Sequence, residues 1–327
     1  MIKHKIVVSD YYYPNFDIET RILMQLGDET EVIDCTKIIP GGAKTPEQLI
    51  PYIKDADALI VQFAKINSQV IDQMDRCKVI ARYAIGVDNI DVEAATKKHI
   101  YVANAPGYCT NEVADTAIAH ILNAMRRITR ARDLLLQGSF TMDSIQPMKR
   151  LEECTLGLLG FGNIARNLAY KIEPLFKKLI VFDPYFSDQK DYPKIDFLAL
   201  EEVLTIADVI SIHVPLNDST RNLISKREFD LMCDGVVLVN TSRGAIIDEP
   251  ALLKALESGK VGFCGLDVLA TEDFTNSPLL RNPFVTITPH IAWSSEGSRV
   301  DLQVKTAENV VAALLQGRPI NSVNLRL

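Results

Sequence analysis

The feature that most constrains this chain is a glycine-containing turn near the middle of the sequence. The segment Gly160-Phe-Gly-Asn-Ile-Ala165 follows an apolar run at 155–159 and precedes a helical pattern. A second apolar run, 179–182, ends at Asp183, about 20 residues further on. The order of strand, glycine turn, helix, strand and acidic residue is typical of a dinucleotide-binding βαβ unit.

Each position in this turn has a physical role. Gly160 permits the tight turn, and Gly162 lets backbone amides approach a pyrophosphate at the positive end of the helix. We therefore predict that Gly160, Gly162, Asn163 and Ile164 bind the pyrophosphate of NAD and that Asp183 binds the adenosine ribose. The alternative interpretation is a tight turn of a parallel α/β protein that binds no cofactor.

The residues that follow the acid bear on which dinucleotide is bound. Pro184 and Tyr185 come directly after Asp183, and the sequence has no arginine beside them to bind a 2′-phosphate. This pattern favours NAD over NADP.

Composition excludes several classes of protein. The 327 residues suffice for two domains, and 47% hydrophobic with 24% charged residues is ordinary for a soluble globular protein. A net charge of −7 gives no support to nucleic acid or an anionic membrane as a partner. The first residues lead into a strand-like run without a signal-peptide core, so we expect a cytoplasmic protein. Six scattered cysteines without a Cys-x-x-Cys pair predict reduced thiols and no metal site.

Short β-branched runs alternate with helical segments, which predicts parallel sheets covered on both faces. A long helix is expected at 110–137, with Thr110 as N-cap and Gly138 as its stop. A final helix at 294–316 has no strand after it in its own unit and is expected to pack on the first unit. Strands are expected at 5–9, 31–35, 58–62, 79–82, 101–104, 155–159, 179–182, 208–212, 236–240, 261–266 and 285–288.

The predicted fold class is therefore α/β, with two doubly wound parallel-sheet domains. A Rossmann NAD-binding domain, 105–290, is inserted into a split, flavodoxin-like domain formed by 1–104 and 291–327. The cleft between two such domains is the default position for a catalytic site.

Two histidines are placed where parallel strands end. His290 follows the strand at 285–288 and suits a general acid–base, although a histidine that only hydrogen-bonds its loop is the alternative. His213 ends another strand and is expected to lie beside the cofactor rather than to act as a catalyst. His120 lies on an apolar helix and is expected to be a buried core histidine.

Three charged residues complete the candidate chemistry. Arg243 follows the strand at 236–240 and suits bidentate binding of a small carboxylate, with an ion pair to Asp248 as the alternative. Glu272 is placed to hydrogen-bond His290, and Asp273 competes for that role. Asp267 ends its strand near the expected nicotinamide ring.

The motifs together resemble the D-isomer-specific 2-hydroxyacid dehydrogenase family, over essentially the whole chain. This resemblance implies an NAD-dependent enzyme that interconverts a 2-keto acid and a D-2-hydroxy acid. It also implies a split substrate domain and a homodimer whose contact is made by the cofactor domains and the long helix. The matching motifs are Arg82–Asp91, the turn at Gly160, Asn240–Gly244, Gly265–Val268 and Thr288–Trp293.

The resemblance also assigns roles to individual residues. The family's catalytic Arg–Glu–His set falls on Arg243, Glu272 and His290. The resemblance implies cofactor contacts for Thr110 and Thr241. It implies substrate contacts for Ile85, Gly86, Trp293 and Tyr83, the last two as aromatic walls.

Within the family, the C-terminal-binding-protein branch is the most similar, on Asn111–Asp115, Asn123–Arg127 and Trp293. That branch includes transcriptional corepressors. The second hypothesis is therefore an NAD(H)-sensing interaction protein that binds short peptides and whose dehydrogenase activity is incidental. The sequence leaves the substrate open among glyoxylate, hydroxypyruvate, phosphoglycerate and larger keto acids.

Overall fold

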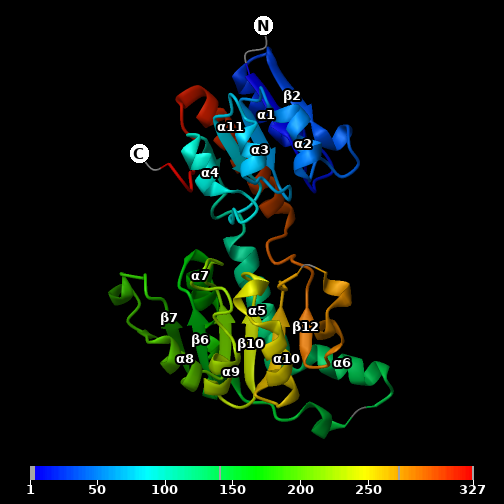
Figure 1. The fold of residues 1–327 in the computed structure, drawn as a ribbon. Helices are drawn as coiled ribbons and strands as arrows, with labels where there is room; N and C mark the ends of the chain where they lie inside the picture. Colours follow the sequence, from blue (N-terminus) through cyan, green and yellow to red (C-terminus); the bar gives the residue numbers. More distant parts are fainter. Residues whose placement is uncertain (1–3, 140, 272, 326–327) are drawn as a thin grey trace. The chain divides into compact units, whose positions relative to one another are not determined.

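The computed structural model describes residues 4–139, 141–271 and 273–325, and the chain divides into two compact units. One unit combines the chain up to Tyr108 with the segment from Ser295 onward, and the other is Cys109–Ser294 (Figure 1). The chain therefore leaves the first unit, builds the second, and returns. Both crossings lie four residues beyond the expected boundaries at 104 and 290.

The first unit contains a parallel five-stranded sheet in the order β2-β1-β3-β4-β5. This is the flavodoxin-like order, in which ligands bind at the carboxyl ends of the strands. Side chains of β3 are buried on both faces, as a sheet covered by helices requires. The strands are β1 (His4–Val8), β2 (Thr30–Asp34), β3 (Ala58–Val61), β4 (Val79–Arg82) and β5 (Tyr101–Ala103).

The last helix of the chain, α11 (Glu296–Gln316), packs on α1 (Asp17–Leu23) and on β4 of the first unit. Gln303 of α11 donates its amide to both carboxylate oxygens of the buried Glu19, each at 3.0 Å. The expectation that the final helix returns to the first unit is confirmed. The other helices of this unit are α2 (Pro46–Ile53), α3 (Ser68–Asp72) and α4 (Val92–Lys97).

The second unit contains a parallel seven-stranded sheet in the order β12-β11-β10-β9-β6-β7-β8. The chain builds outward from β6 to β8 and then restarts at β9 on the other side of β6, as in a Rossmann fold. In folds of this type a ligand binds at the point where the strand order reverses, which here is between β6 and β9. The strands are β6 (Thr155–Leu159), β7 (Lys178–Phe182), β8 (Ile195–Phe197), β9 (Val209–Ile212), β10 (Val236–Asn240), β11 (Val261–Leu266) and β12 (Val285–Ile287).

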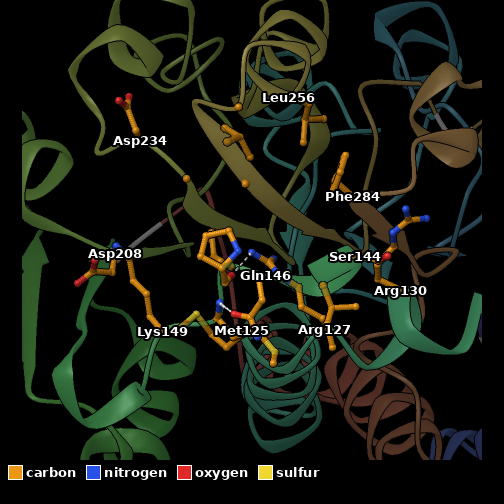
Figure 2. Close-up of a pocket in the computed structure, with 18 residues that line it drawn as sticks. Met125, Arg127, Arg130, Ser144, Gln146, Lys149, Asp208, Asp234, Leu256 and Phe284 are labelled. Carbon is orange, nitrogen blue, oxygen red and sulfur yellow. Dashed lines mark hydrogen bonds and ion pairs between the residues drawn. The ribbon is translucent and has the colours of Figure 1, made fainter. Parts of the chain in front are cut away.

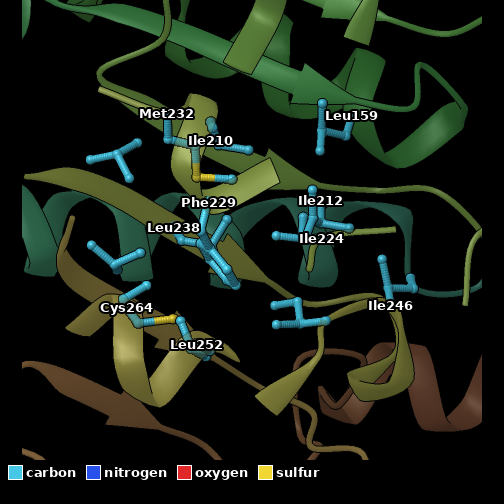
Figure 3. Close-up of a cluster of buried hydrophobic side chains, with 14 of the residues drawn as sticks. Leu159, Ile210, Ile212, Ile224, Phe229, Met232, Leu238, Ile246, Leu252 and Cys264 are labelled. Carbon is cyan, nitrogen blue, oxygen red and sulfur yellow. The ribbon is translucent and has the colours of Figure 1, made fainter. Parts of the chain in front are cut away.

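Helices bury apolar side chains against both faces of this sheet. Helices α5 (Thr110–Arg126) and α7 (Asn163–Ile172) supply the core on one face. The core on the other face is formed by α8 (Leu200–Ile206), α9 (Lys226–Leu231) and α10 (Glu249–Glu257). Figure 3 shows this second core, with Phe229 and Leu252 from the helices facing strand residues such as Leu238.

Two elements differ from the expectation. The long helix is interrupted at Arg127, whose φ of 55° is left-handed, so α6 (Ile128–Leu136) is a separate helix. The break is held because the Asn123 side chain accepts hydrogen bonds from both the amide and the hydroxyl of Thr129, each at 2.9 Å. Strand β8 was not expected, since its sequence Ile-Asp-Phe has a charged, exposed residue in the middle and lacks the apolar run that indicated the other strands.

The cysteines and the long helices bear on the expected redox state and on membrane crossing. The six cysteines are present as reduced thiols, and five of them are buried. No helix within residues 4–139, 141–271 and 273–325 is both long and apolar enough to cross a membrane.

Candidate active site

One row of paired backbone positions crosses six strands of the second unit's sheet and organises the candidate site. The row is Phe182, Leu159, Ile212, Asn240, Leu266 and Ile287. Because these strands are parallel, the next residue of each strand also lies in a row, at the carboxyl edge of the sheet. Those next residues are Asp183, Gly160, His213, Thr241, Asp267 and Thr288. Register therefore brings five residues predicted to bind the cofactor to one edge.

The glycine turn has the geometry that a dinucleotide-binding loop requires. Gly160 has a φ of +93°, and a Cβ atom there would lie 2.9 Å from the backbone carbon of His213. Gly162 is the N-cap of α7, no side chain hydrogen-bonds there, and an added Cβ would meet no atom within 4 Å. The start of α7 therefore presents backbone amides beside open space, which suits an anionic group.

Asp183 is fixed by the same turn. One carboxylate oxygen accepts a hydrogen bond from the amide of Phe161 at 2.8 Å, and the other accepts one from the amide of Tyr185 at 2.9 Å. Its position beside Gly160 in the row is the one expected for a residue that binds the adenosine ribose.

Sequence reasoning missed an aromatic cluster that supports this turn. The ring of Phe161, fully buried between the two glycines, meets Phe186, Tyr192 and Phe197 edge-on at centroid distances of 5.0, 4.9 and 5.3 Å. The three partners come from the segment after Asp183, so the cluster joins the phosphate-side turn to the ribose-side segment. Their irregular spacing gives no periodic signal.

Thr110 begins α5, which runs beside α7 in the same direction. Asn167 of α7 donates to the side chain of Asn111 at 2.7 Å, and one turn later Lys171 pairs with Asp115 at 2.6 Å. The amino ends of both helices therefore point to the same edge of the sheet, where Thr110 was expected to contact the cofactor.

Arg243 lies in a tightly held turn after β10. The side chain of Asn240 accepts a hydrogen bond from the amide of Ser242 and donates one to the carbonyl of Arg243, both at 2.9 Å. The guanidinium donates to the carbonyl of Ser242 at 2.9 Å. Gly244 follows in contact with the loop after β11, since an added Cβ would lie 1.9 Å from the carbonyl carbon of Leu269.

Asp267 shapes the segment that carries His290. Its buried carboxylate accepts hydrogen bonds from the Thr288 hydroxyl at 2.6 Å and from the amides of Ile291 and Ala292 at 3.0 and 2.9 Å. The backbone of His290 is left-handed, with φ of 53°, and its amide donates to the carbonyl of Asp267 at 2.8 Å. Asp267 thus holds an uncommon backbone conformation that directs a half-buried histidine.

Trp293 and His120 support the same segment. The indole of Trp293 donates to the carbonyl of His290 at 3.0 Å. The Thr288 hydroxyl gives its only hydrogen to Asp267, so the Nε2–H of His120 must donate to Thr288 across 3.1 Å. Burial lowers the pKa of His120, which is consistent with this neutral tautomer. His120 is the buried, hydrogen-bonded core histidine that was expected.

His213 is also neutral at this edge. Its ring is within 2.9 Å of the Ser211 hydroxyl, and burial lowers its pKa from 6.5 to about 4. The backbone of His213 lies beside Gly160 and Thr241 at the carboxyl edge.

Acidification is expected to destabilise the fold through His213. The unfolded histidine takes up its proton near pH 6.5, whereas the folded one does so near 4. The stability that His213 contributes is therefore fully present above pH 6.5 and is lost as the pH falls towards 4. Between pH 7 and pH 5 this lowers the free energy of unfolding by about 2 kcal/mol. Urea melts at the two pH values measure this loss, which should shrink in His213→Asn. An equal loss in both proteins would contradict the assignment.

The substrate-binding residues predicted in the first unit are Tyr83, Ile85 and Gly86. The ring of Tyr83 is 2% exposed, and its hydroxyl donates to the buried Glu19 at 2.6 Å. This interior position leaves almost no accessible surface on the ring, so Tyr83 does not form the aromatic wall that was expected. Ile85 and Gly86 are half-buried in the segment after β4. Glu272 lies outside the described residues.

A cavity of about 400 Å³ in the second unit lies away from these residues. Its lining includes Asp208, Gly235 and Val261, which stand at the amino ends of β9, β10 and β11 (Figure 2). In a parallel sheet that edge is opposite the carboxyl edge. The cavity is therefore not the candidate active site, which is defined by chemistry and register instead.

The carboxyl edge fits a bound dinucleotide by three observations. A Cβ at Gly162 would occupy the open space at the start of α7, and Asp183 stands beside Gly160. The buried hydroxyl of Thr241 has no hydrogen-bond partner in the described part of the chain.

No group of His, Cys, Asp and Glu in that part is arranged to hold a metal ion.

The fold and this edge define a Rossmann-type, dinucleotide-dependent oxidoreductase. Residues 118–292 match the model of the D-isomer specific 2-hydroxyacid dehydrogenase, NAD binding domain. The chain belongs to this family.

Individual relatives agree with the assignment. The chain is 34% identical over 287 residues to a glyoxylate reductase of Thermococcus litoralis, covering 84% of this chain and 86% of that one. It is 35% identical over 283 residues to a D-3-phosphoglycerate dehydrogenase of Archaeoglobus fulgidus, covering 85% of this chain but only 53% of the relative. The crystal structure of a glyoxylate reductase from Paecilomyes thermophila superposes with a TM-score of 0.88, at 27% identity and 99% coverage of both chains.

Proposed function

We propose that this protein interconverts a small 2-keto acid and its D-2-hydroxy acid with NAD(H). The observation that carries the proposal is the placement of Arg243 and His290. Arg243 follows β10 and His290 follows β12, and each lies three residues past the last residue of its strand. Only β11 separates these strands, so the two strands lie about 10 Å apart in the sheet and end at the same edge. A small acid bound over the nicotinamide end of the site is within reach of both side chains.

The roles follow from the chemistry of the two side chains. The Arg243 guanidinium pairs with the substrate carboxylate and orients the neighbouring carbonyl. His290 donates a proton to the carbonyl oxygen during reduction and accepts it back during oxidation. NAD supplies the hydride acceptor, and NADH the donor. Asp267 and Thr288 hold the His290 backbone so that the ring meets the carbonyl oxygen.

Further roles rest on the family resemblance. Glu272 is proposed to hydrogen-bond His290 and to keep it protonated for reduction near neutral pH. Trp293 is proposed to form one wall of the substrate site. Ile85 and Gly86 are proposed to donate backbone hydrogen bonds to the carboxylate.

The preference for NAD over NADP is proposed on Asp183, since a carboxylate beside the ribose repels a 2′-phosphate. The structure also places one arginine, Arg166, beside the segment that follows Asp183. The Arg166 guanidinium is 5.8 Å from the ring centroid of Phe186, and it also hydrogen-bonds Asn163. The cofactor preference therefore needs a direct comparison of NADH with NADPH.

A homodimer is proposed through the helical region 110–137. Helix α6 exposes Ile128, Leu135 and Leu136, with 60%, 62% and 71% of their surfaces accessible. Large apolar side chains gathered on one short helix are typical of a protein interface.

The experiment that tests the proposed function is a survey of NADH oxidation. Purified protein is mixed with NADH or NADPH and a panel containing glyoxylate, hydroxypyruvate, pyruvate, phenylpyruvate and 4-methyl-2-oxopentanoate. We expect saturable oxidation of NADH by at least one acid. Absence of turnover with every acid would contradict the proposal.

A further inference from the structure

Three consecutive carbonyl groups after β4 are held by hydrogen bonds. The carbonyl of Ala84 accepts from the amide of Ala105 at 2.9 Å. The carbonyl of Ile85 accepts from the Asn104 side chain at 2.7 Å, and that of Gly86 accepts from the Arg82 guanidinium at 2.7 Å. Two side chains thus fix the peptide planes on either side of Gly86.

The orientation of these carbonyls determines where the next amides point. In a planar trans peptide the C=O and the following N–H point in opposite directions. The amides of Ile85, Gly86 and Val87 therefore point away from Ala105, Asn104 and Arg82. None of the three donates a hydrogen bond to an acceptor within the described residues.

Such a row of amides suits a small anion. Successive backbone N–H groups without internal partners form a concave site of partial positive charge. The segment is half-buried at the carboxyl edge of the first unit's parallel sheet, where ligands bind in this type of fold.

The two side chains are themselves anchored. The carbonyl of Asn104 accepts from Asn309 of α11 at 2.9 Å, and Asn309 is 1% exposed. Arg82 ends β4, and its Nε donates to the carbonyl of Gln62 at 3.3 Å. Arg82 is the last residue of β4 and Asn104 follows the last residue of β5, so both donors are held at strand ends by hydrogen bonds to other parts of the first unit.

We propose that Asn104 and Arg82 are positioning residues that turn the amides of residues 85–87 toward the substrate carboxylate. The proposal rests on the proposed function, because it takes the 2-keto acid as the anion. It adds that affinity for the carboxylate depends on two side chains that never touch the substrate.

The test replaces Asn104 with alanine and compares substrate binding with cofactor binding. Loss of the donor frees the Ile85 carbonyl, so the Gly86 amide no longer has one fixed direction. We expect KM for the keto acid and the inhibition constant of oxamate, a carboxylate analogue of a 2-keto acid, to rise together by about tenfold. The dissociation constant of NADH and the pH profile of kcat should stay unchanged.

Asn324→Ala is the matched control. Asn324 hydrogen-bonds the amide of Val102 on β5 at 2.9 Å and the carbonyl of Ile100 at 2.8 Å, but no atom of residues 84–87. It should lower the melting temperature without changing oxamate inhibition. If Asn104→Ala does not fold, Arg82→Lys makes the same comparison, because lysine lacks the guanidinium fork.

The outcomes separate this proposal from the proposed function. Wild-type protein that turns over no keto acid refutes both. Wild-type turnover with an unchanged oxamate constant in Asn104→Ala and in Arg82→Lys refutes the positioning role alone. An equal rise in Asn324→Ala also refutes it, since the effect would then be a general loss of stability.

Discussion

Replacing His290 with asparagine is expected to lower kcat by about 10²–10⁴-fold while leaving NADH affinity unchanged. Asparagine cannot transfer the proton, but it tolerates the left-handed backbone that His290 adopts at φ of 53°. The Asp267 carboxylate holds this segment by accepting hydrogen bonds from two backbone amides and from the Thr288 hydroxyl, so these bonds survive the change. Steady-state turnover and NADH fluorescence titration measure the two quantities.

His290→Ala is the companion variant, because it also removes the imidazole but fits the left-handed backbone less well. Equal losses of kcat in the two variants locate the effect in the ring rather than in the backbone. Near-wild-type turnover in His290→Asn would contradict the assignment of the general acid–base to His290.

Replacing Gly162 with valine is expected to weaken NAD binding strongly at a cost of only about 1 kcal/mol in stability, because valine is a poorer N-cap than glycine. The φ of −72° at Gly162 is open to any L-residue, and an added Cβ meets no protein atom within 4 Å. A branched side chain there fills the space in which the pyrophosphate would approach the start of α7. We expect binding to weaken about 10–100-fold, from the ~1–3 kcal/mol that extra methyl groups cost in a tightly packed site.

Gly160→Val provides the contrast. Here φ is +93° and the added Cβ would lie 2.9 Å from the backbone of His213, so the substitution strains the fold itself. We expect a loss of about 2–4 kcal/mol in the free energy of unfolding. Calorimetric titration with NADH and a thermal melt of each variant distinguish the two. A Gly162→Val protein that binds NADH normally would contradict the location of the cofactor.

The sheets could be predicted from the sequence because their strands are buried on both faces. Apolar runs such as 236–240 and 261–266 coincide with β10 and β11 residue for residue. Parallel pairing then carries the residue after each run to one edge, so Asp183, Gly160 and Asp267 could be assigned from chain order alone.

Other features could not be predicted because they depend on tertiary contacts. The break at Arg127 has no glycine or proline to announce it and is held by the side chain of Asn123. Tyr83 follows a strand like a site residue, yet its ring turns inward to Glu19. The direction of the amides near Gly86 depends on Asn104, 18 residues away in the sequence, and no local pattern encodes such a contact.

The measurement that tests the central claim most directly is NADH oxidation by 2-keto acids in the wild type and in Arg243→Ala. We expect saturable turnover of at least one acid, with kcat/KM reduced by about 100-fold or more in the variant and NADH affinity retained. Tight NADH binding with no turnover on any acid, or turnover that is unaffected by loss of Arg243, would contradict the account. The first of these results would direct attention to an NAD(H)-sensing protein and its partner.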